Sequence, residues 1–296
     1  MRGVGRASGA ITFVNALHCG QGCAAAIDLG CEVAVELERT LPGELPRTVI
    51  DPGSDTPLVR AALAHGLRAT APTEKFDVRL SVRSAIPWAR GLKSSSAVTV
   101  AVLEAVSRAY GTLPEPAFLA RTSAELSRSL GISATGAFDD ALAAIGGGVV
   151  LTDNANFEVL ATGAAGSEWE VAIWFPPEEH AASSSLAGRF QGNVREGQLA
   201  MAEAMTGDYL AAMLRNTRLV EKALRYGYGP MRVELLRQGA LGAGVCGMGP
   251  AIAAVAPGDR LVRVSEAFPQ SRGEVILTRF RAEGELPSPL TGREEP

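Results

Sequence analysis

The segment Gly91-Leu-Lys-Ser-Ser-Ser-Ala97, followed at once by an apolar stretch, constrains the fold of this chain more than any other part of the sequence. Alanine and valine recur at helical spacing from Ala97 to Val106, which predicts a helix with a serine as its N-cap. A glycine turn before a helix directs backbone N–H groups and the positive end of the helix dipole towards one point. Together with the charge of Lys93, these groups predict a phosphate site. The alternative is a serine-rich cap on a surface helix.

The sequence argues against three better known motifs. The P-loop requires glycine directly before its lysine, whereas Leu92 precedes Lys93 here. The stretch Gly20-Gln-Gly22-Cys-Ala-Ala25 matches a dinucleotide fingerprint, but a strand pattern resumes by Cys31, too soon for the long helix that this fingerprint needs. The sequence also holds no G-x-S-x-G elbow, which argues against a serine hydrolase.

Strand and helix patterns follow each other without the strict alternation of a doubly wound sheet, which predicts an α+β fold. The length of 296 residues fits two domains, expected at 1–158 and 159–283, with a frayed polar tail at 284–296. The periodicity of apolar residues predicts strands at 10–17, 31–38, 77–83, 146–152, 170–175, 251–256 and 273–280. Helices are expected at 56–70, 94–106, 115–130 and 259–268 and within 195–237, with a hairpin or linker at 153–168 and a glycine-rich loop at 239–250.

Two further segments carry candidate chemistry. Asp139 and Asp140 lie in a nearly uncharged stretch where a helix is expected to begin. Adjacent carboxylates point in different directions, so one can cap the helix while the other takes a proton from a substrate hydroxyl. The alternative is a pair of acids favoured only by the helix dipole. The glycine loop Gly244–Ala251 either packs its backbone against the first loop or simply connects a helix to a strand.

Composition excludes several functions. The net charge of −4 argues against a nucleic-acid surface, and the uncharged runs are too polar to span a membrane. The four cysteines lack the spacing of a disulfide framework or a zinc site, and the three histidines show no metal spacing. We therefore expect a soluble, cytoplasmic protein with reduced thiols. Only three lysines stand beside 25 arginines, and one of the three is Lys93.

Taken in order, four segments resemble the GHMP kinases, which include galacto-, homoserine, mevalonate and phosphomevalonate kinases. Within that superfamily the chain is most similar to the archaeal-type shikimate kinases. The similarity spans almost the whole chain, and the combination of the second and third segments is far more specific than either alone. The segments are Ala7–Thr12 with Val14–Ala16, Ala89–Ala97, Thr135–Ala141 with Gly147–Asn154, and Cys246–Ala251.

The resemblance implies an amino half like domain 2 of ribosomal protein S5 and a ferredoxin-like carboxyl half, with the site between them. It implies an enzyme that uses ATP and Mg²⁺ to phosphorylate the 3-hydroxyl of shikimate in aromatic amino-acid synthesis. The implied partners are shikimate and ATP, without nucleic acid or membrane. Homoserine or mevalonate as the acceptor and a non-catalytic binding protein remain alternatives.

The resemblance also implies residue roles. The phosphates would be held by Gly91, Leu92, Lys93, Ser94, Ser95 and Ser96, and the nucleotide site would be completed by Gly247 and Gly249. Asp139 would accept the hydroxyl proton and Lys93 would assist catalysis, while Asn15 and Thr135 would contact the substrate. Ser95 and Glu125 would be Mg²⁺ ligands. The chain departs from the pattern at Gln21, where relatives carry lysine, and at Cys246, where they carry serine or threonine.

Overall fold

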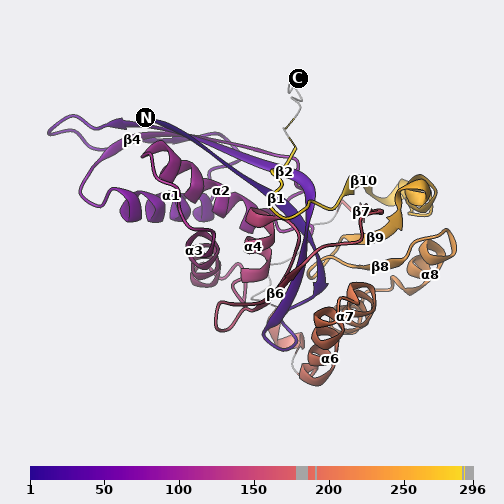
Figure 1. Cartoon of the computed structure of the whole chain (residues 1–296). Coiled ribbons are helices and arrows are strands. Elements are labelled where there is room, and N and C mark those ends of the chain that lie inside the picture. Colours follow the sequence, from indigo (N-terminus) through magenta and orange to yellow (C-terminus); the bar gives the residue numbers. More distant parts are fainter. Residues whose placement is uncertain (178–185, 191, 289, 291–296) are drawn as a thin grey trace.

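The computed structural model describes residues 1–177, 186–190, 192–288 and 290, and its strands form two sheets (Figure 1). The first sheet has the order β3-β4-β2-β5-β6, with β1 paired to β2, and only the β3–β4 pair is parallel. The second has the order β10-β7-β9-β8 and is antiparallel. The first sheet comprises β1 (Arg2–Val14), β2 (Gln21–Arg39), β3 (Thr48–Ile50), β4 (Phe76–Ser84), β5 (Val149–Asp153) and β6 (Glu158–Gly163). The second comprises β7 (Trp169–Phe175), β8 (Gly242–Val245), β9 (Ile252–Pro257) and β10 (Glu274–Arg279).

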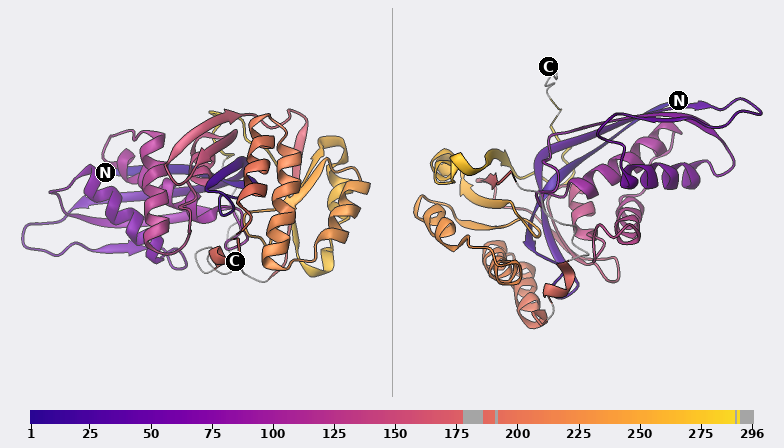
Figure 2. Two further views of the ribbon diagram at one scale, coloured as in Figure 1. Left: turned by 90° about the horizontal axis from the view of Figure 1, so that it is seen from below. Right: turned by 180° about the vertical axis from the view of Figure 1, so that it is seen from behind.

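Helices divide between the two sheets. In Figure 1, the early helices lie together on one face of the first sheet, and the later helices lie towards the second sheet in Figure 2, where the first of them also packs on the ends of β1 and β2. The early helices are α1 (Pro57–Thr70), α2 (Ser94–Ala109), α3 (Pro116–Ser129) and α4 (Phe138–Gly146). The later ones are α6 (Val194–Met205), α7 (Tyr209–Leu224), α8 (Gly229–Arg237) and α9 (Leu261–Glu266). Short 3₁₀ turns lie at Ala187–Phe190, Gly258–Arg260 and Gln270–Arg272.

Helix α2 is the centre of the first core. It packs on β1 and β2, and nearly all of its side chains are buried. Gly3 and Gly5 of β1 have no room for a Cβ, because one built there would meet the α2 backbone at Ala101 and Ala105. This close approach fixes the helix on the sheet, and with it the position of the N-terminus of α2.

The structure differs from the sequence expectations at several element boundaries. Strand β2 begins at Gln21, so all of the G-x-G-x-x-A stretch except Gly20 lies within a strand and no helix follows it. Strand β6 pairs with β5, so the first sheet continues to Gly163, beyond the expected boundary at 158. The expected loop at 239–250 contains β8, whose small residues pair with β9. Short, glycine-rich strands of this kind give little periodic signal.

The expectation of a frayed tail is wrong for its described part. Just before the tail, Arg281, 1% exposed, donates from Nη2 to the carbonyls at the C-terminal end of α4. The backbone N–H of Gly284 donates to the carbonyl of Gly146, and Ser288 donates to the carboxylate of Asp28. A polar sequence can therefore lie flat on the first sheet because its hydrogen bonds are made with that sheet and with α4.

Candidate active site

Loops from both halves of the chain meet around a cavity of about 340 Å³. Its wall is formed by the end of β1 and the following turn, the loop before α2, the α3–α4 connection and the loop after β8. The members that were expected from the sequence are Asn15, Gly91, Lys93, Ser94, Ser95, Ser96, Thr135, Asp139, Gly247 and Gly249. The cavity therefore collects, in one place, candidates that lie far apart in the chain.

The two glycine loops pack backbone against backbone. Gly91 has a φ of +85°, and a Cβ there would collide with the carbonyl of Cys246 and lie 3.0 Å from the carbonyl oxygen of Gly249. The N–H of Ala251 donates to the carbonyl of Arg90 at 3.3 Å. Only glycine can adopt this φ without strain and also let the backbones of the two loops come this close at position 91. Of the two alternatives that the sequence left open for Gly244–Ala251, the structure shows the one in which this loop packs its backbone on the first loop.

The predicted serine N-cap of α2 is wrong. The N-cap residue is Lys93, whose backbone is left-handed at φ 69°, and no side chain caps the helix. A serine cap needs extended backbone at the cap position, and the turn through Gly91 and Lys93 does not supply it. Ser94, Ser95 and Ser96 instead occupy the first turn and line the cavity. This uncapped helix end suits an anion.

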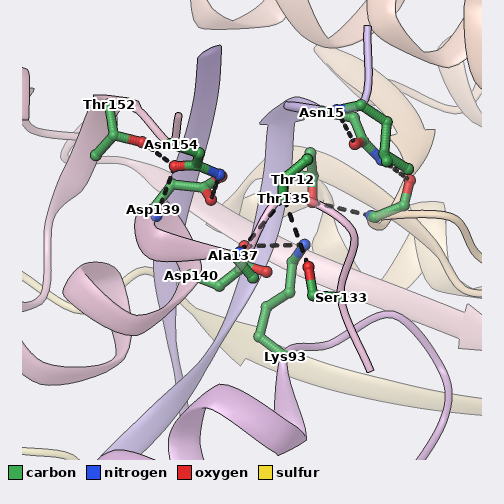
Figure 3. A network of polar contacts seen from close by, with 12 residues as sticks. Thr12, Asn15, Lys93, Ser133, Thr135, Ala137, Asp139, Asp140, Thr152 and Asn154 are labelled. Atoms are coloured by element: carbon green, nitrogen blue, oxygen red, sulfur yellow. Dashed lines mark hydrogen bonds and ion pairs between the residues drawn. The ribbon is translucent and has the colours of Figure 1, made fainter. Parts of the chain in front are cut away.

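Lys93 and Asp140 form an ion pair inside the cavity wall, with 3.0 Å between Nζ and Oδ1 (Figure 3). The pKa of Asp140 is raised to about 7, mainly by burial and also by the charge of Asp139, even though the Lys93 ammonium lowers it. Burial opposes the charge on Lys93, but the two carboxylates together raise its pKa above the ordinary value. The pair therefore consists of a firmly charged lysine and a carboxyl group that titrates near neutrality.

Asp139 is held by two buried polar residues at the end of β5. Its carboxylate Oδ1 accepts a hydrogen bond from Asn154 Nδ2 at 2.8 Å, and its backbone N–H donates to Asn154 Oδ1 at 3.2 Å. The hydroxyl of Thr152 donates to the same Asn154 oxygen at 2.7 Å. Because Asn154 donates to it, the carboxylate of Asp139 is held as an acceptor.

Gly22 of β2 provides the space that Asp139 occupies. A Cβ built on Gly22 would lie 2.7 Å from the carboxyl carbon of Asp139, whereas ordinary contacts begin at 3.4 Å. The φ of Gly22 is not in the left-handed region, so glycine is needed here because it lacks a side chain and not because of its backbone conformation. Any side chain at this position must displace the carboxylate.

The second half of the chain is fastened to the end of β1. The N–H of Asn15 donates to Asn216 Oδ1 at 2.8 Å, and Asn15 Nδ2 donates to the carbonyl of Gly247 at 3.0 Å. The N–H of Gly247 in turn donates to Thr12 Oγ1 at 2.9 Å. Asn15, expected to contact substrate, lines the cavity and also fixes the second glycine loop.

Some expected site residues lie elsewhere. Glu125 is exposed on α3 and is not among the described residues that line the cavity. Leu92 is fully buried in the core, so its side chain does not face the cavity. The side chains of Gln21 and Cys246 also lie outside the lining, and burial raises the pKa of the Cys246 thiol to about 12. The two departures from the family pattern, at Gln21 and Cys246, therefore leave the described lining of the cavity unchanged.

Sequence reasoning missed several residues of the site. Thr12, Gly22, Thr152 and Asn154 were not given roles, and the Lys93–Asp140 pair was not foreseen. A signal existed for Thr152, because it is a polar residue that directly continues the apolar run Val149–Leu151 of an expected strand, whereas Asn154 lies in the polar stretch that follows. Buried polar residues of this kind must find partners.

The cavity can bind a phosphate chain and a hard cation. Lys93 and the first turn of α2 supply positive charge, while the Ser95 hydroxyl supplies an oxygen donor of the kind that Mg²⁺ prefers. Within the described ranges, no three His, Cys, Asp or Glu side chains gather as a metal site by themselves. A cation here would therefore share oxygens of its ligand, as Mg²⁺ does in nucleotide sites.

Comparison with known proteins gives consistent relatives. A model of the N-terminal domain of GHMP kinases matches residues 57–148. A shikimate kinase of Pyrococcus abyssi (strain GE5 / Orsay) is 35% identical over 286 residues, which cover 95% of this chain and 100% of that protein. A shikimate kinase of Halobacterium salinarum (strain ATCC 29341 / DSM 671 / R1) is 32% identical, with 96% and 98% covered.

The structure of Methanococcus jannaschii mevalonate kinase is similar in fold. It superimposes with a TM-score of 0.73 at 14% identity and covers 94% of this chain and 98% of that one. The expected α+β architecture is confirmed by this match. In the parts of the chain that the structure describes, none of the helices combines the length and the hydropathy needed to cross a membrane.

Proposed function

The chain belongs to the GHMP kinase family, and on that premise we propose that it is a shikimate kinase. It would transfer the γ-phosphate of ATP to the 3-hydroxyl of shikimate, a step of aromatic amino-acid (chorismate) biosynthesis. The observation that carries the proposal is the cavity in which the N-terminus of α2 and Lys93 face Asp139 and Asp140. Phosphoryl transfer asks a protein mainly for positioning and for neutralisation of charge, and this wall supplies both.

The phosphates of ATP would lie at the first turn of α2. The uncapped N–H groups and the hydroxyls of Ser94, Ser95 and Ser96 can bind their oxygens, and Lys93 can neutralise their charge. Gly91 would shape this part of the site, because a Cβ there would collide with the backbone of the second loop, and Gly247 and Gly249 would shape that loop through their positive φ. Leu92 would contribute through its buried side chain, by anchoring the loop.

Asp139 would accept the proton of the attacking hydroxyl. Asn154 holds this carboxylate as an acceptor, and 4% of the residue is exposed. Asp140 is the weaker candidate, because it is already paired with Lys93. Asn15 and Thr135, which line the same cavity, would contact shikimate.

Ser95 would be the protein ligand of Mg²⁺, because its hydroxyl lines the cavity beside the expected phosphates. The cation would neutralise charge on the phosphate oxygens. Glu125 is left out of this proposed site, because it is exposed and lies outside the cavity wall. The four free cysteines agree with a reducing, cytoplasmic location, which we include in the proposal.

The test is an assay of purified protein with ATP, Mg²⁺ and each of shikimate, homoserine and mevalonate, in which ADP release and the phosphorylated product are measured. Turnover of shikimate alone is expected. Turnover of homoserine or mevalonate without shikimate would keep the family and refute the substrate. Binding of ATP and shikimate in calorimetry without transfer would favour a non-catalytic relative.

A pair of variants tests the base. Asp139→Asn is expected to lower kcat by about 10²- to 10⁴-fold with ATP binding retained, because it removes a proton acceptor but keeps the shape of the side chain. Asp140→Asn is the matched comparison. A normal kcat for Asp139→Asn beside a large loss for Asp140→Asn would move the base to Asp140.

A further inference from the structure

We infer that Asn154, a residue outside the cavity, is a positioning residue for phosphoryl transfer that fixes the carboxylate of Asp139, with Thr152 fixing the orientation of its amide. The inference rests on the proposed function, in which Asp139 is the proton acceptor. It assigns a role to two side chains that cannot touch a substrate, since both are fully buried and neither is among the described lining residues.

The orientation of the Asn154 amide is determined by its neighbours (Figure 3). Two donors meet its Oδ1, the hydroxyl of Thr152 at 2.7 Å and the backbone N–H of Asp139 at 3.2 Å. The backbone N–H can only donate, so the oxygen of the amide must face it. The Nδ2 group is then left facing Asp139 Oδ1, to which it donates at 2.8 Å.

The arrangement fixes both ends of Asp139. One side chain receives the backbone N–H of Asp139 and donates to its carboxylate, so the side-chain torsions of Asp139 have little freedom. The other carboxylate oxygen lies next to the backbone of Gly22, which limits movement in that direction. Asp139 is therefore held in one orientation before any ligand binds.

The backbone of Asn154 is hydrogen-bonded to residues of two segments that contribute to the cavity wall. Its N–H donates to the carbonyl of Gly20 at 2.9 Å, in the turn that follows Asn15. Its carbonyl accepts from Arg128 Nη2 at 2.7 Å, and the same nitrogen donates to the carbonyl of Thr135 at 2.9 Å. Asn154 thus ties the proposed acceptor to the two segments that carry the proposed substrate contacts.

The first test removes the interactions one at a time. Asn154→Ala and Thr152→Val are expected to lower kcat by about 10- to 100-fold, because a misplaced acceptor raises the barrier to transfer, while KM for ATP stays close to that of the wild type. Thr152→Ser keeps the hydroxyl and is expected to restore kcat. Asn156→Ala removes an exposed amide two residues away and serves as the control.

Thr152→Val keeps the inference testable if Asn154→Ala does not fold, because it preserves the shape of the buried side chain. A merely structural role predicts a lower melting temperature with unchanged kcat per folded molecule. That result for Thr152→Val would overturn the inference. Equal losses in Thr152→Val and Thr152→Ser would also overturn it, because the hydroxyl would then have no role.

The deciding experiment is a double-mutant cycle in an Asp139→Asn background. If Asn154 acts through Asp139, adding Asn154→Ala to Asp139→Asn leaves the residual kcat unchanged, since groups that act as a unit are not additive. A further loss of the same factor as in the wild type would overturn the inference and leave the proposed function intact. A normal kcat for Asp139→Asn alone would instead refute the proposed role of Asp139, and this inference with it.

Discussion

Gly22→Ala tests whether the geometry around Asp139 limits the reaction. The new methyl group would begin 2.7 Å from the carboxyl carbon of Asp139, against 3.4 Å for the closest ordinary contact. The carboxylate must therefore retreat by roughly 0.7 Å or more, and its hydrogen bond to Asn154 resists that movement. A misplacement of about 1 Å at a reacting group costs on the order of 10²-fold in rate.

The expected result is a loss of kcat near 10²-fold with a much smaller change in KM for ATP, since the phosphate loop is not touched. Overpacking of this kind costs about 1–3 kcal/mol of unfolding free energy. Part of this cost is offset because alanine restricts the unfolded chain more than glycine does. Steady-state kinetics and urea unfolding separate the two effects.

Gly146→Ala is the matched control. Gly146 is the last residue of α4, the helix that carries Asp139, and a Cβ there has nothing within 4 Å. The variant is expected to keep wild-type kcat and stability or to gain a little stability. Near-normal kcat in Gly22→Ala would refute the reasoning, because it would show that displacing the carboxylate has no consequence for the reaction.

Three further outcomes are expected. At pH 8, Lys93→Met should lower the unfolding free energy by about 3–5 kcal/mol, because Asp140 is then buried either as an unpaired carboxylate or as an acid that must take up a proton on folding. The double variant Lys93→Met/Asp140→Asn should lower it less, and urea titrations that show the reverse order would contradict this expectation. The pKa of Asp140 is raised from 3.8 to about 7, so between these values the folded protein binds a proton that the unfolded chain does not. The unfolding free energy of the wild type should therefore fall as pH rises from about 4 to 7, and Asp140→Asn should make this pH dependence smaller. Glu125→Gln should leave the Mg²⁺ concentration needed for half-maximal rate unchanged, whereas Ser95→Ala should raise it. A Mg²⁺ titration of the activity of both variants decides between the two expected ligands.

The loop before α2 was recognisable as a candidate phosphate site because its signal is local. A turn of glycine, a cation and small polar residues before an apolar helix lie within a few consecutive positions, and their chemistry does not depend on distant segments. Even so, the N-cap was misassigned. Its conformation depends on Gly91 packing under the carbonyls of Cys246 and Gly249, which is a contact between segments far apart in the chain.

The carboxylates illustrate the opposite case. Asp139 and Asp140 were recognisable as candidates. The difference between their environments, however, depends on their partners, which are Lys93 for Asp140 and Asn154 for Asp139. Neither distance along the chain nor residue type reveals which acid meets the lysine and which meets the amide. The exposure of Glu125 could not be predicted from the sequence either, because the packing of the helix decides whether such a carboxylate faces solvent or the cavity.

Backbone strain gives independent support for the location of the site. Within the described ranges, the non-glycine residues with positive φ are Ala89, Lys93, Ala137, Phe157 and Arg225, and the first three of them line the cavity. Such conformations cost about 1–2 kcal/mol each in a residue with a Cβ, and glycine would remove that cost.

Strained conformations persist only where the surroundings hold them. The N–H of Ala137 donates to Thr135 Oγ1 at 3.3 Å and its carbonyl accepts from Ala141 at 3.2 Å, while Lys93 is held by Asp140 and by the first turn of α2. Glycine at these positions would relieve strain but would let both loops adopt other shapes. Alanine and lysine leave fewer alternatives, so less conformational entropy remains to be lost when phosphates and acceptor bind.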